Sequence, residues 1–315
     1  MDRPGALAQL RRAVTEFAAR PGIPEGSWCV ALSGGADSLA LTAAAAAVRP
    51  TVALIVDHGL QAGSAAVAAR AREQASQLGC VAAQLLTVTV GGPGGPEAAA
   101  RAARYDALDA ARDGAPVLLG HTLDDQAETV LLGLGRGAGP RSLAGMRPYR
   151  PPWGRPLLGV RRTVTAAACA ELGVTPWQDP HNDDPRYRRV RLRSEVLPLL
   201  EDVLGGGVAE ALARTATALQ EDGDALDALA AGHTGDELAV AELIDQPAAV
   251  RRRIIRGWLL ARGAVDLKDV QLRGVEELVT AWRGQGGVAV GSPRRRQRLV
   301  ARRRDGALTL VVEGV

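Results

Sequence analysis

Short apolar runs alternate with helix-favouring stretches through the first half of the chain. The apolar runs predict strands at residues 28–32, 51–56, 81–88 and 116–120. The stretches before, between and after them predict helices at residues 1–20, 37–48, 62–78, 97–112 and 123–134. Strands and helices that alternate in this way are typical of an α/β fold with a doubly wound parallel sheet, in which ligands bind at the carboxyl ends of the strands.

A run of three glycines, at residues 205–207, predicts the boundary of a second domain. Beyond it the pattern predicts helices at 208–231, 238–244, 247–262 and 268–283, and short strands at 288–290, 298–301 and 308–312. We therefore expect a larger domain over residues 1–203 and a smaller, mainly helical domain over residues 208–315 that ends in a small antiparallel sheet. A length of 315 residues agrees with two cores.

Composition and charge narrow the class of protein. The chain has no apolar run of the roughly 18 residues that a membrane span needs and no signal-peptide pattern, so we expect a cytoplasmic protein without a membrane partner. The three cysteines are scattered, which argues against a disulfide framework or a zinc site. Residues 251–315 hold 15 Arg or Lys against 6 Asp or Glu, whereas residues 1–250 hold 23 against 29. This basic tail predicts contact with a polyanion; the alternative is a solvated surface in an arginine-rich chain.

The segment Ser33-Gly34-Gly35-Ala36-Asp37-Ser38 follows the first strand and opens a helix. Its glycines allow backbone N–H groups to face an anion at the positive end of that helix. Ser33 and Ser38 add hydroxyl donors, and Asp37 stands where a carboxylate can meet a divalent cation bound to phosphates. The segment therefore predicts a phosphate-binding loop. The alternative is an ordinary strand-to-helix corner, which has no use for two hydroxyls and a carboxylate.

Two other phosphate-binding motifs do not fit this chain. A Walker loop ends in Gly-Lys followed by Ser or Thr, and the only lysine, Lys268, is far from any glycine-rich turn. Gly133, Gly135 and Ala138 have the spacing of a dinucleotide fingerprint, but they follow a predicted helix instead of a strand. We treat that spacing as accidental.

A second group of polar residues follows the strand predicted at 116–120. His121, Asp125 and Glu128 are spaced so that one face of a helix would hold all three. Clustered carboxylates need a cation between them, and oxygen ligands without a thiolate suit Mg²⁺. The alternative is an N-cap with an acidic first helical turn, for which Asp124 and Asp125 would suffice.

The loop at residues 33–38 resembles the SGGxDS loop of the PP-loop ATP pyrophosphatase superfamily. Members of that superfamily cleave ATP between its α and β phosphates and transfer AMP to an oxygen atom. Residues 121–129 resemble the H-x-x-DDQAET segment of the tRNA(Ile)-lysidine synthetase family within it. Further segments that match in order and spacing lie at residues 56–60, 97–105, 136–139, 143–146, 155–158 and 177–182. The chain departs from the family pattern at His181 and Val190.

The resemblance implies a two-step reaction on an isoleucine tRNA with a CAU anticodon. ATP adenylates the C2 oxygen of the anticodon cytidine and releases pyrophosphate, and the ε-amine of free lysine then displaces AMP to leave lysidine. Mg²⁺ is implied as well, and a homodimer is one alternative for the oligomeric state. The rival functions are a tRNA 2-thiolase on the same fold, which the missing CxxC pairs disfavour, and a nucleotide-binding sensor without chemistry.

Roles for individual residues follow from the matched motifs and the charge pattern. ATP binding is expected from Ser33, Gly34, Gly35, Ala36, Asp37, Ser38, Asp57, His58 and His121. Catalysis is expected from Asp37, Asp125, Glu128, Arg101 and Arg104, with Asp37 and Asp125 as metal ligands. Contact with tRNA is expected from Arg186, Arg189, Arg191, Arg193, Arg294, Arg295 and Arg296. Trp177 is a candidate wall for the pocket of an unstacked cytidine.

Overall fold

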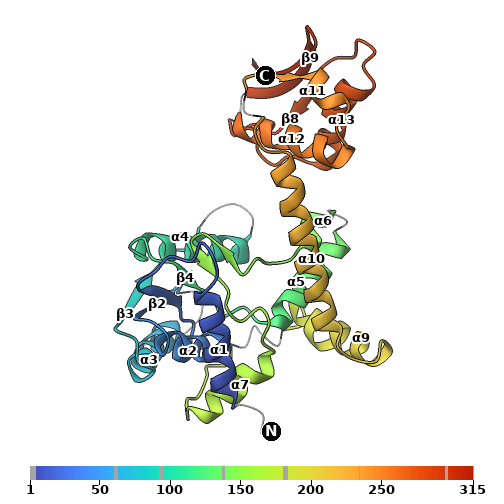
Figure 1. Ribbon diagram of the computed structural model, residues 1–315. Helices are drawn as coiled ribbons and strands as arrows, with labels where there is room; N and C mark the ends of the chain where they lie inside the picture. Colours follow the sequence, from blue (N-terminus) through green and yellow to red (C-terminus); the bar gives the residue numbers. More distant parts are fainter. Residues whose placement is uncertain are drawn as a thin grey trace. The chain divides into compact units, whose positions relative to one another are not determined.

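The chain forms two compact units, Met1–Thr217 and Ala218–Val315 (Figure 1). The structure is a computed structural model that describes residues 5–59, 63–91, 95–136, 139–179, 184–233, 235–294 and 297–314. The division between the units falls inside helix α10 (Val208–Leu229), and each unit has a hydrophobic core of its own. No helix in the described part of the chain has the length and apolarity of a membrane span.

The first unit is built on a six-stranded sheet of order β3-β2-β1-β4-β6-β5. Its strands are β1 (Trp28–Ala31), β2 (Thr51–Asp57), β3 (Ala82–Thr87), β4 (Val117–Leu118), β5 (Tyr149–Arg150) and β6 (Trp153–Gly154). All neighbouring strands are parallel except β5 and β6, which pair antiparallel at one edge. The strand order reverses between β1 and β4, and sheets of this kind bind ligands beside such a reversal.

Alternate residues of the central strands face two different apolar layers. On one face Val30, Ile55 and Leu118 pack in the main core with the helices α1, α2, α3 and α7. On the other face Cys29 and Leu54 pack against α4. Figure 1 shows α4 on the opposite side of the sheet from α1, α2 and α7. Because successive strand residues point to opposite faces, apolar runs without polar alternation mark strands that are covered on both sides.

The helices of the first unit agree closely with the sequence pattern up to residue 135. These helices are α1 (Ala6–Ala18), α2 (Ala36–Ala46), α3 (Ser64–Gln77), α4 (Pro96–Ala111) and α5 (Leu123–Gly135). The predicted α/β doubly wound sheet is thereby confirmed. The elements that the pattern did not predict are the β5–β6 hairpin, α6 (Pro140–Leu143), α7 (Arg162–Glu171), α8 (Arg188–Arg191), the π-helical turn η2 (Leu192–Val196) and α9 (Leu197–Val203).

The first turns of α10 pack within the first unit. Ala209 lies in a small apolar cluster with Leu123 of α5 and Leu197 of α9. Glu210 accepts two hydrogen bonds from Arg161, from Nε and from Nη2, each of 2.7 Å. This half of the helix therefore contributes to the fold of the first unit.

The second unit combines the end of α10 with short helices and a small sheet. Its other elements are β7 (Leu238–Ala239), α11 (Val240–Ile244), α12 (Ala248–Ala261), α13 (Asp269–Thr280), β8 (Val288–Val290), β9 (Gln297–Arg304) and β10 (Ala307–Gly314). The strands form an antiparallel sheet of order β7-β10-β9-β8, which confirms the predicted small sheet and adds β7 to it. Trp258 of α12, Leu278 of α13 and Leu308 of β10 are buried in its core.

Candidate active site

The turn between β1 and α2 has the backbone geometry of an anion-binding loop. Gly34 has a φ of +83°, which favours glycine, and Gly35 is the N-cap of α2. The N–H groups in the first turn of α2 have no acceptors within their own helix. They point along the helix axis with the positive end of the helix dipole, so the turn can hold phosphate oxygens.

The two serine hydroxyls of the turn bond within the loop. Ser38 Oγ donates to the carbonyl of Gly35 at 2.9 Å and accepts the backbone N–H of Ser33 at 3.2 Å, and the two hydroxyl oxygens are 3.1 Å apart. Ser38 is buried. From outside the loop, the N–H of Trp177 donates to the carbonyl of Gly34 at 2.9 Å. These bonds fix the loop shape; contact of the hydroxyls with ATP stays a prediction.

The carboxyl ends of β2, β1, β4 and β6 lie side by side, which brings together segments far apart in the sequence. Asp57 ends β2 and accepts the N–H of Gly59, which with Ser64 lowers the pKa of this exposed carboxyl. Gly120 comes shortly after β4 and lies close to α2. A Cβ added to it would be 3.0 Å from the carbonyl carbon of Asp37. The segment after β4 therefore touches the first turn of α2.

Helix α5 begins at Leu123, where the sequence pattern predicts it. Its N-cap is Thr122, so His121 precedes the helix, and the predicted shared helical face of His121, Asp125 and Glu128 is wrong for His121. Asp125 Oδ2 accepts the Thr122 N–H at 2.8 Å and the Thr122 hydroxyl at 2.9 Å, which completes a capping box. Asp125 therefore serves as a capping residue through Oδ2. Its other oxygen, Oδ1, is not used in the cap and has a different partner, so capping does not exclude a role in the site.

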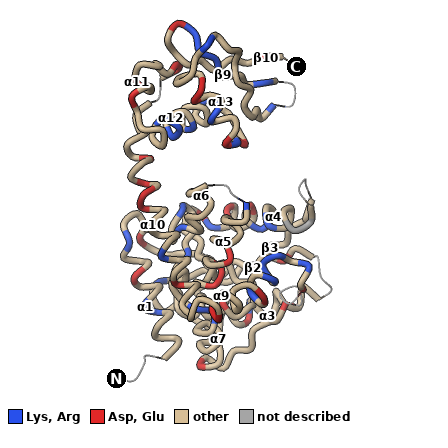
Figure 2. The backbone as a smooth tube through the Cα atoms, turned by 90° about the vertical axis from the view of Figure 1, so that its right-hand side faces the viewer, with Lys and Arg blue, Asp and Glu red and all other residues tan. Residues whose placement is uncertain are grey.

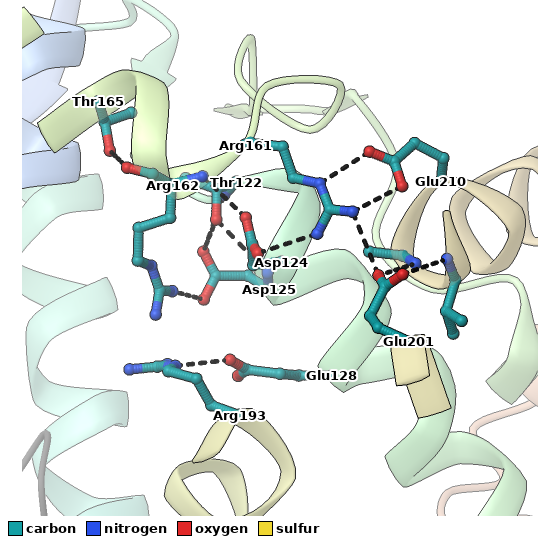
Figure 3. Close-up of polar contacts among 12 residues, drawn as sticks. Thr122, Asp124, Asp125, Glu128, Arg161, Arg162, Thr165, Arg193, Glu201 and Glu210 are labelled. Atoms are coloured by element: carbon teal, nitrogen blue, oxygen red, sulfur yellow. Dashed lines mark hydrogen bonds and ion pairs between the residues drawn. The ribbon is translucent and has the colours of Figure 1, made fainter. Parts of the chain in front are cut away.

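That partner is Arg162, from the first residue of α7, which lies between Asp125 and Asp37. Its Nη2 donates to Asp125 Oδ1 at 2.7 Å, and its Nε lies 3.3 Å from Asp37 Oδ2. The other oxygen of Asp37 accepts a hydrogen bond from the Thr165 hydroxyl. Figure 3 shows Arg162 and Thr122 both bonded to the carboxylate of Asp125. One guanidinium therefore bridges the carboxylates that the sequence predicts as metal ligands.

The two carboxyl groups differ in their acidity. Burial raises the pKa of Asp37 above its ordinary value, against the opposing effects of Thr165 and Arg162. Burial also acts to raise the pKa of Asp125, but Arg162 and the Thr122 N–H outweigh it, so that pKa lies below its ordinary value. Relative to free carboxyl groups, the folded protein therefore favours the ionised form of Asp125 and disfavours that of Asp37.

Glu128 lies one turn beyond Asp125 on α5, and its side chain is 0% exposed. Its Oε1 accepts from Nε of Arg193 at 2.9 Å (Figure 3). Its Oε2 lies 3.4 Å from Nη1 of Arg189. Glu128 is also among the carboxylates whose charge raises the pKa of Arg162. The acids predicted from two distant segments therefore do gather beside the glycine turn.

A basic group with aromatic neighbours faces His121 from the other direction. Arg101 donates to the Tyr105 hydroxyl at 3.2 Å, and its guanidinium carbon lies 4.9 Å from the centre of that ring. Burial and the charge of Arg101 lower the pKa of Arg104. Arg155, which follows β6, has its pKa lowered chiefly by burial. Among the described side chains these guanidiniums have no carboxylate partner, so they suit an anion such as a phosphate.

His121 lies between the acidic and the basic groups. Burial lowers its pKa from 6.5 to about 4; the charge of Asp125 opposes this effect, whereas Arg155, Arg101 and Arg104 reinforce it. Its Nδ1 is buried and has no hydrogen-bond partner among the described residues. The ring is therefore neutral at physiological pH and presents one unsatisfied nitrogen.

This neutral state can be tested by NMR. In protein with labelled histidine, the ring signals of His121 should stay constant from about pH 8 to about pH 5.5 and move only near its low pKa. Because the unfolded chain takes up this proton near pH 6.5, the stability that His121 contributes should fall as the pH drops from 6.5 towards 4. A midpoint near 6.5 in the folded protein would contradict the burial of this ring.

Arg162, Thr165 and Arg155 belong to the site, but the sequence pattern assigned them no role. One signal was available: Arg161 and Arg162 are consecutive cations at the start of α7, where the helix dipole disfavours positive charge. The structure supplies the carboxylates that compensate. Asp124 accepts the backbone N–H of Arg162 at 2.8 Å, and Arg161 binds Asp124, Glu201 and Glu210 (Figure 3).

The four predicted tRNA contacts between residues 186 and 193 have protein partners in this structure. Arg186 pairs with Asp184 and Arg191 with Glu195. Arg189 and Arg193 both face Glu128.

In the second unit, basic positions lie along α12 (blue in Figure 2). Many arginines of this unit pair internally, namely Arg251, Arg252, Arg253, Arg262, Arg273 and Arg302. Arg294 is exposed, whereas Arg295 and Arg296 lie outside the described residues, as do Gly137, Ala138 and residues 180–183 of the matched motifs.

The comparisons with known proteins agree with this geometry. Residues 7–200 match the PP-loop domain family, and residues 238–309 match the TilS substrate binding domain family. The chain is 67% identical over 324 residues to the tRNA(Ile)-lysidine synthase of Mycobacterium bovis, and 69% identical over 321 residues to that of Mycolicibacterium paratuberculosis, with 100% of each chain covered in both cases. Identity to the tRNA(Ile)-lysidine synthase of Nocardia farcinica is 65% over 288 residues, which cover 89% of this chain and 90% of the relative.

Among solved structures, the U34-tRNA thiolase NcsA from Methanococcus maripaludis, with its 4Fe–4S cluster, is similar with a TM-score of 0.55. The match has 18% sequence identity and covers 69% of this chain and 80% of the thiolase chain. At this identity the likeness shows the fold alone.

Proposed function

We propose that the charged groups around α2 and α5 carry out both steps of lysidine formation, with free lysine as the second substrate. The proposal starts from the family: this chain belongs to the tRNA(Ile)-lysidine synthases, ligases that use ATP to form lysidine on tRNA(Ile). One observation carries the proposal. Asp37, from the phosphate loop, and Asp125, from the segment after β4, converge on one cation-binding position at the strand-order reversal.

In the first step the C2 oxygen of the cytidine attacks the α phosphorus of ATP. The bond between the α phosphorus and the bridging oxygen breaks, and pyrophosphate leaves with the electron pair. Negative charge grows on the leaving group, so fixed donors directed at it lower the barrier. We assign this role to the N–H groups at the start of α2 and to Arg101 and Arg104, which have no carboxylate partner among the described side chains.

The residues present fit a magnesium ion that is shared with the phosphates. Among the described residues, no three His, Cys, Asp or Glu side chains gather as a metal site, so a cage made of protein ligands alone is not formed there. Mg²⁺ usually takes one or two carboxylates and completes its shell with phosphate oxygens and water. Asp37 and Asp125 would hold it, and when bound it supplies positive charge to the phosphates.

In the second step the ε-ammonium of lysine passes a proton to a carboxylate of the site, and the resulting amine attacks C2 of the adenylated cytidine. The C2–O bond breaks and AMP leaves with the electron pair. Lysine arrives as an ammonium ion, so the site must hold this cation close to the cytidine ring. We assign this task to the acidic group of Asp125 and Glu128, where Glu128 also fixes the guanidiniums of Arg189 and Arg193.

The proposal is tested by pyrophosphate release in mixtures that each lack one component. We expect release with ATP, Mg²⁺ and tRNA(Ile), and modified tRNA only when lysine is also present. Release that needs lysine but no tRNA would indicate a small-molecule ligase. ATP binding with no release in any mixture would favour the sensor. Since the reaction acts on tRNA and consumes ATP, we propose the cytoplasm as its compartment.

We further propose that the basic second unit contacts the tRNA backbone, and Arg294 offers a test. Arg294 is exposed, and among the described residues its guanidinium makes only a 3.4 Å hydrogen bond to Gln297. Arg294→Ala should weaken tRNA binding several-fold and reduce the slope of log affinity against log salt by about 0.7 to 0.9, the value for one lost phosphate contact. The matched control is Arg273→Ala, because Arg273 is exposed but paired with Asp269. An unchanged salt slope for Arg294→Ala would exclude a phosphate contact by this residue.

A further inference from the structure

Arg162 occupies the position between the two carboxylates that a bridging cation would take. It donates to Asp125 at 2.7 Å with good hydrogen-bond distance, but its Nε reaches Asp37 only as a 3.3 Å ion pair and makes no hydrogen bond. Its backbone N–H is held by Asp124 at 2.8 Å, so the start of α7 is anchored while the side chain is not fully bonded. The guanidinium is therefore attached firmly to one carboxylate and loosely to the other.

The surroundings favour a cation here at all times. Burial acts to lower the pKa of Arg162, but the charges of Asp125, Asp37 and Glu128 outweigh it, so that this pKa is raised. Asp37 and Asp125 both lie within 3.3 Å of the Arg162 guanidinium. Two ionised carboxylates this close together repel each other unless a positive charge lies between them. A guanidinium and a dication cannot both fill that point, because they would repel each other at close range.

We propose that Arg162 is the internal counter-ion of the Asp37–Asp125 pair, that it suppresses metal binding in the nucleotide-free enzyme, and that it moves to the ATP phosphates when metal and nucleotide enter together. The inference rests on the proposed roles of Asp37 and Asp125. Phosphate oxygens offer a guanidinium the same planar, two-pronged acceptor geometry as a carboxylate. The entering nucleotide would thus give Arg162 a new partner and free the carboxylates for the metal.

This arrangement couples the two ligands. Nucleotide that binds Arg162 raises metal affinity, and by linkage the metal raises nucleotide affinity by the same factor. Removing Arg162 should change the affinity for metal alone and the affinity for nucleotide alone in opposite directions. Without Arg162, metal alone should bind more tightly and nucleotide alone more weakly. Loss of a merely structural residue would weaken both.

The experiment uses the full-length protein, with Mn²⁺ in place of Mg²⁺ so that free metal can be counted by electron paramagnetic resonance. The nucleotide is an ATP analogue with a methylene bridge between its α and β phosphates. Without nucleotide, Arg162→Gln should bind Mn²⁺ about tenfold more tightly than the unchanged protein, within the usual range of such couplings. In EDTA it should bind the analogue about tenfold more weakly. Arg161→Gln is the matched control, because Arg161 starts the same helix but pairs with Asp124, Glu201 and Glu210.

Two further measurements keep the test decisive. Arg162→Lys retains the charge and should keep Mn²⁺ affinity low, which covers the case in which Arg162→Gln does not fold. The melting temperature of Arg162→Gln should rise with Mn²⁺ more than that of the unchanged protein. Equal nucleotide-free Mn²⁺ affinities in Arg162→Gln and the unchanged protein would overturn the inference. Failure of the unchanged protein to bind Mn²⁺ even with the analogue would instead overturn the proposed metal site.

Discussion

Asp37→Asn is expected to reduce tRNA-dependent pyrophosphate release by about 10³-fold, equivalent to about 4 kcal/mol of transition-state stabilisation. The side chain lies in the first turn of α2, against Arg162 and Thr165, where it would meet a metal bound to the leaving phosphates. The amide has the same shape but no charge. Affinity for tRNA should be unchanged, because the carboxylate contacts Thr165 and Arg162 of α7, neither of which is an expected tRNA contact.

Stability separates this functional role from a structural one. The pKa of Asp37 is raised mainly by burial, so the folded protein holds the proton more tightly than the unfolded chain does. Stability therefore falls as the pH rises through the window above the ordinary Asp pKa, and a neutral side chain removes that loss. Asp37→Asn should melt at the same or a higher temperature than the unchanged protein. A large drop in melting temperature together with lost tRNA binding would mean that Asp37 is structural; Asp202→Asn, at an exposed carboxylate on α9, is the control.

Glu128→Gln is expected to reduce lysine transfer by about 10²-fold while tRNA-dependent pyrophosphate release in the absence of lysine persists. The buried carboxylate balances Arg193 and Arg189, and a neutral amide leaves both guanidiniums without a counter-charge. A positive surplus beside Asp125 would repel an incoming ammonium ion. The free energy of unfolding should fall by about 2 kcal/mol, less than for a fully buried pair because both arginines are partly exposed.

The measurements are single-turnover incorporation of labelled lysine and urea unfolding. Glu195→Gln is the matched control. Glu195 pairs with Arg191, which lies between Arg189 and Arg193 in the sequence, but this pair is exposed. That variant should behave as the unchanged protein, as surface ion pairs contribute little. Normal lysine transfer by Glu128→Gln would remove this residue from the second step.

The sequence predicts the first half of the fold well because the signals there are local. Apolar runs such as Thr51–Asp57 are too short for helices and are covered on both faces, and each is followed by a helix-favouring stretch. The glycine turn at residues 34 and 35 is also local. Residues 140–203 are different: α6, α8 and η2 are short, and a two-residue pairing such as β5 with β6 leaves no periodic pattern.

The candidate site was predicted where one motif holds the residues and missed where tertiary packing supplies them. Asp37, Asp125 and Glu128 were predicted from their own segments, and the structure brings them together. Arg162 and Thr165 enter from α7, more than a hundred residues beyond Asp37, and no spacing rule links them to it. The prediction that His121 shares a helical face with Asp125 is wrong because Thr122 is the N-cap of α5, so the helix starts after His121.

The same contacts change the meaning of the arginine cluster at residues 186–193. Charge alone predicts that such residues face a polyanion. In the structure Arg189 and Arg193 neutralise a buried carboxylate of the candidate site, whereas Arg186 and Arg191 form exposed pairs. A role of this segment in tRNA contact stays a prediction, and it would link tRNA binding to the position of Glu128.

The central claim is that this site joins free lysine to a tRNA cytidine by way of an adenylate. The most direct measurement is mass analysis of the nucleosides from tRNA(Ile) incubated with the enzyme, ATP, Mg²⁺ and isotope-labelled lysine. The account predicts that one cytidine per tRNA is replaced by a nucleoside that carries the labelled lysine, with one AMP formed for each. Pyrophosphate release without any labelled nucleoside, or label on a product other than that cytidine, would contradict it.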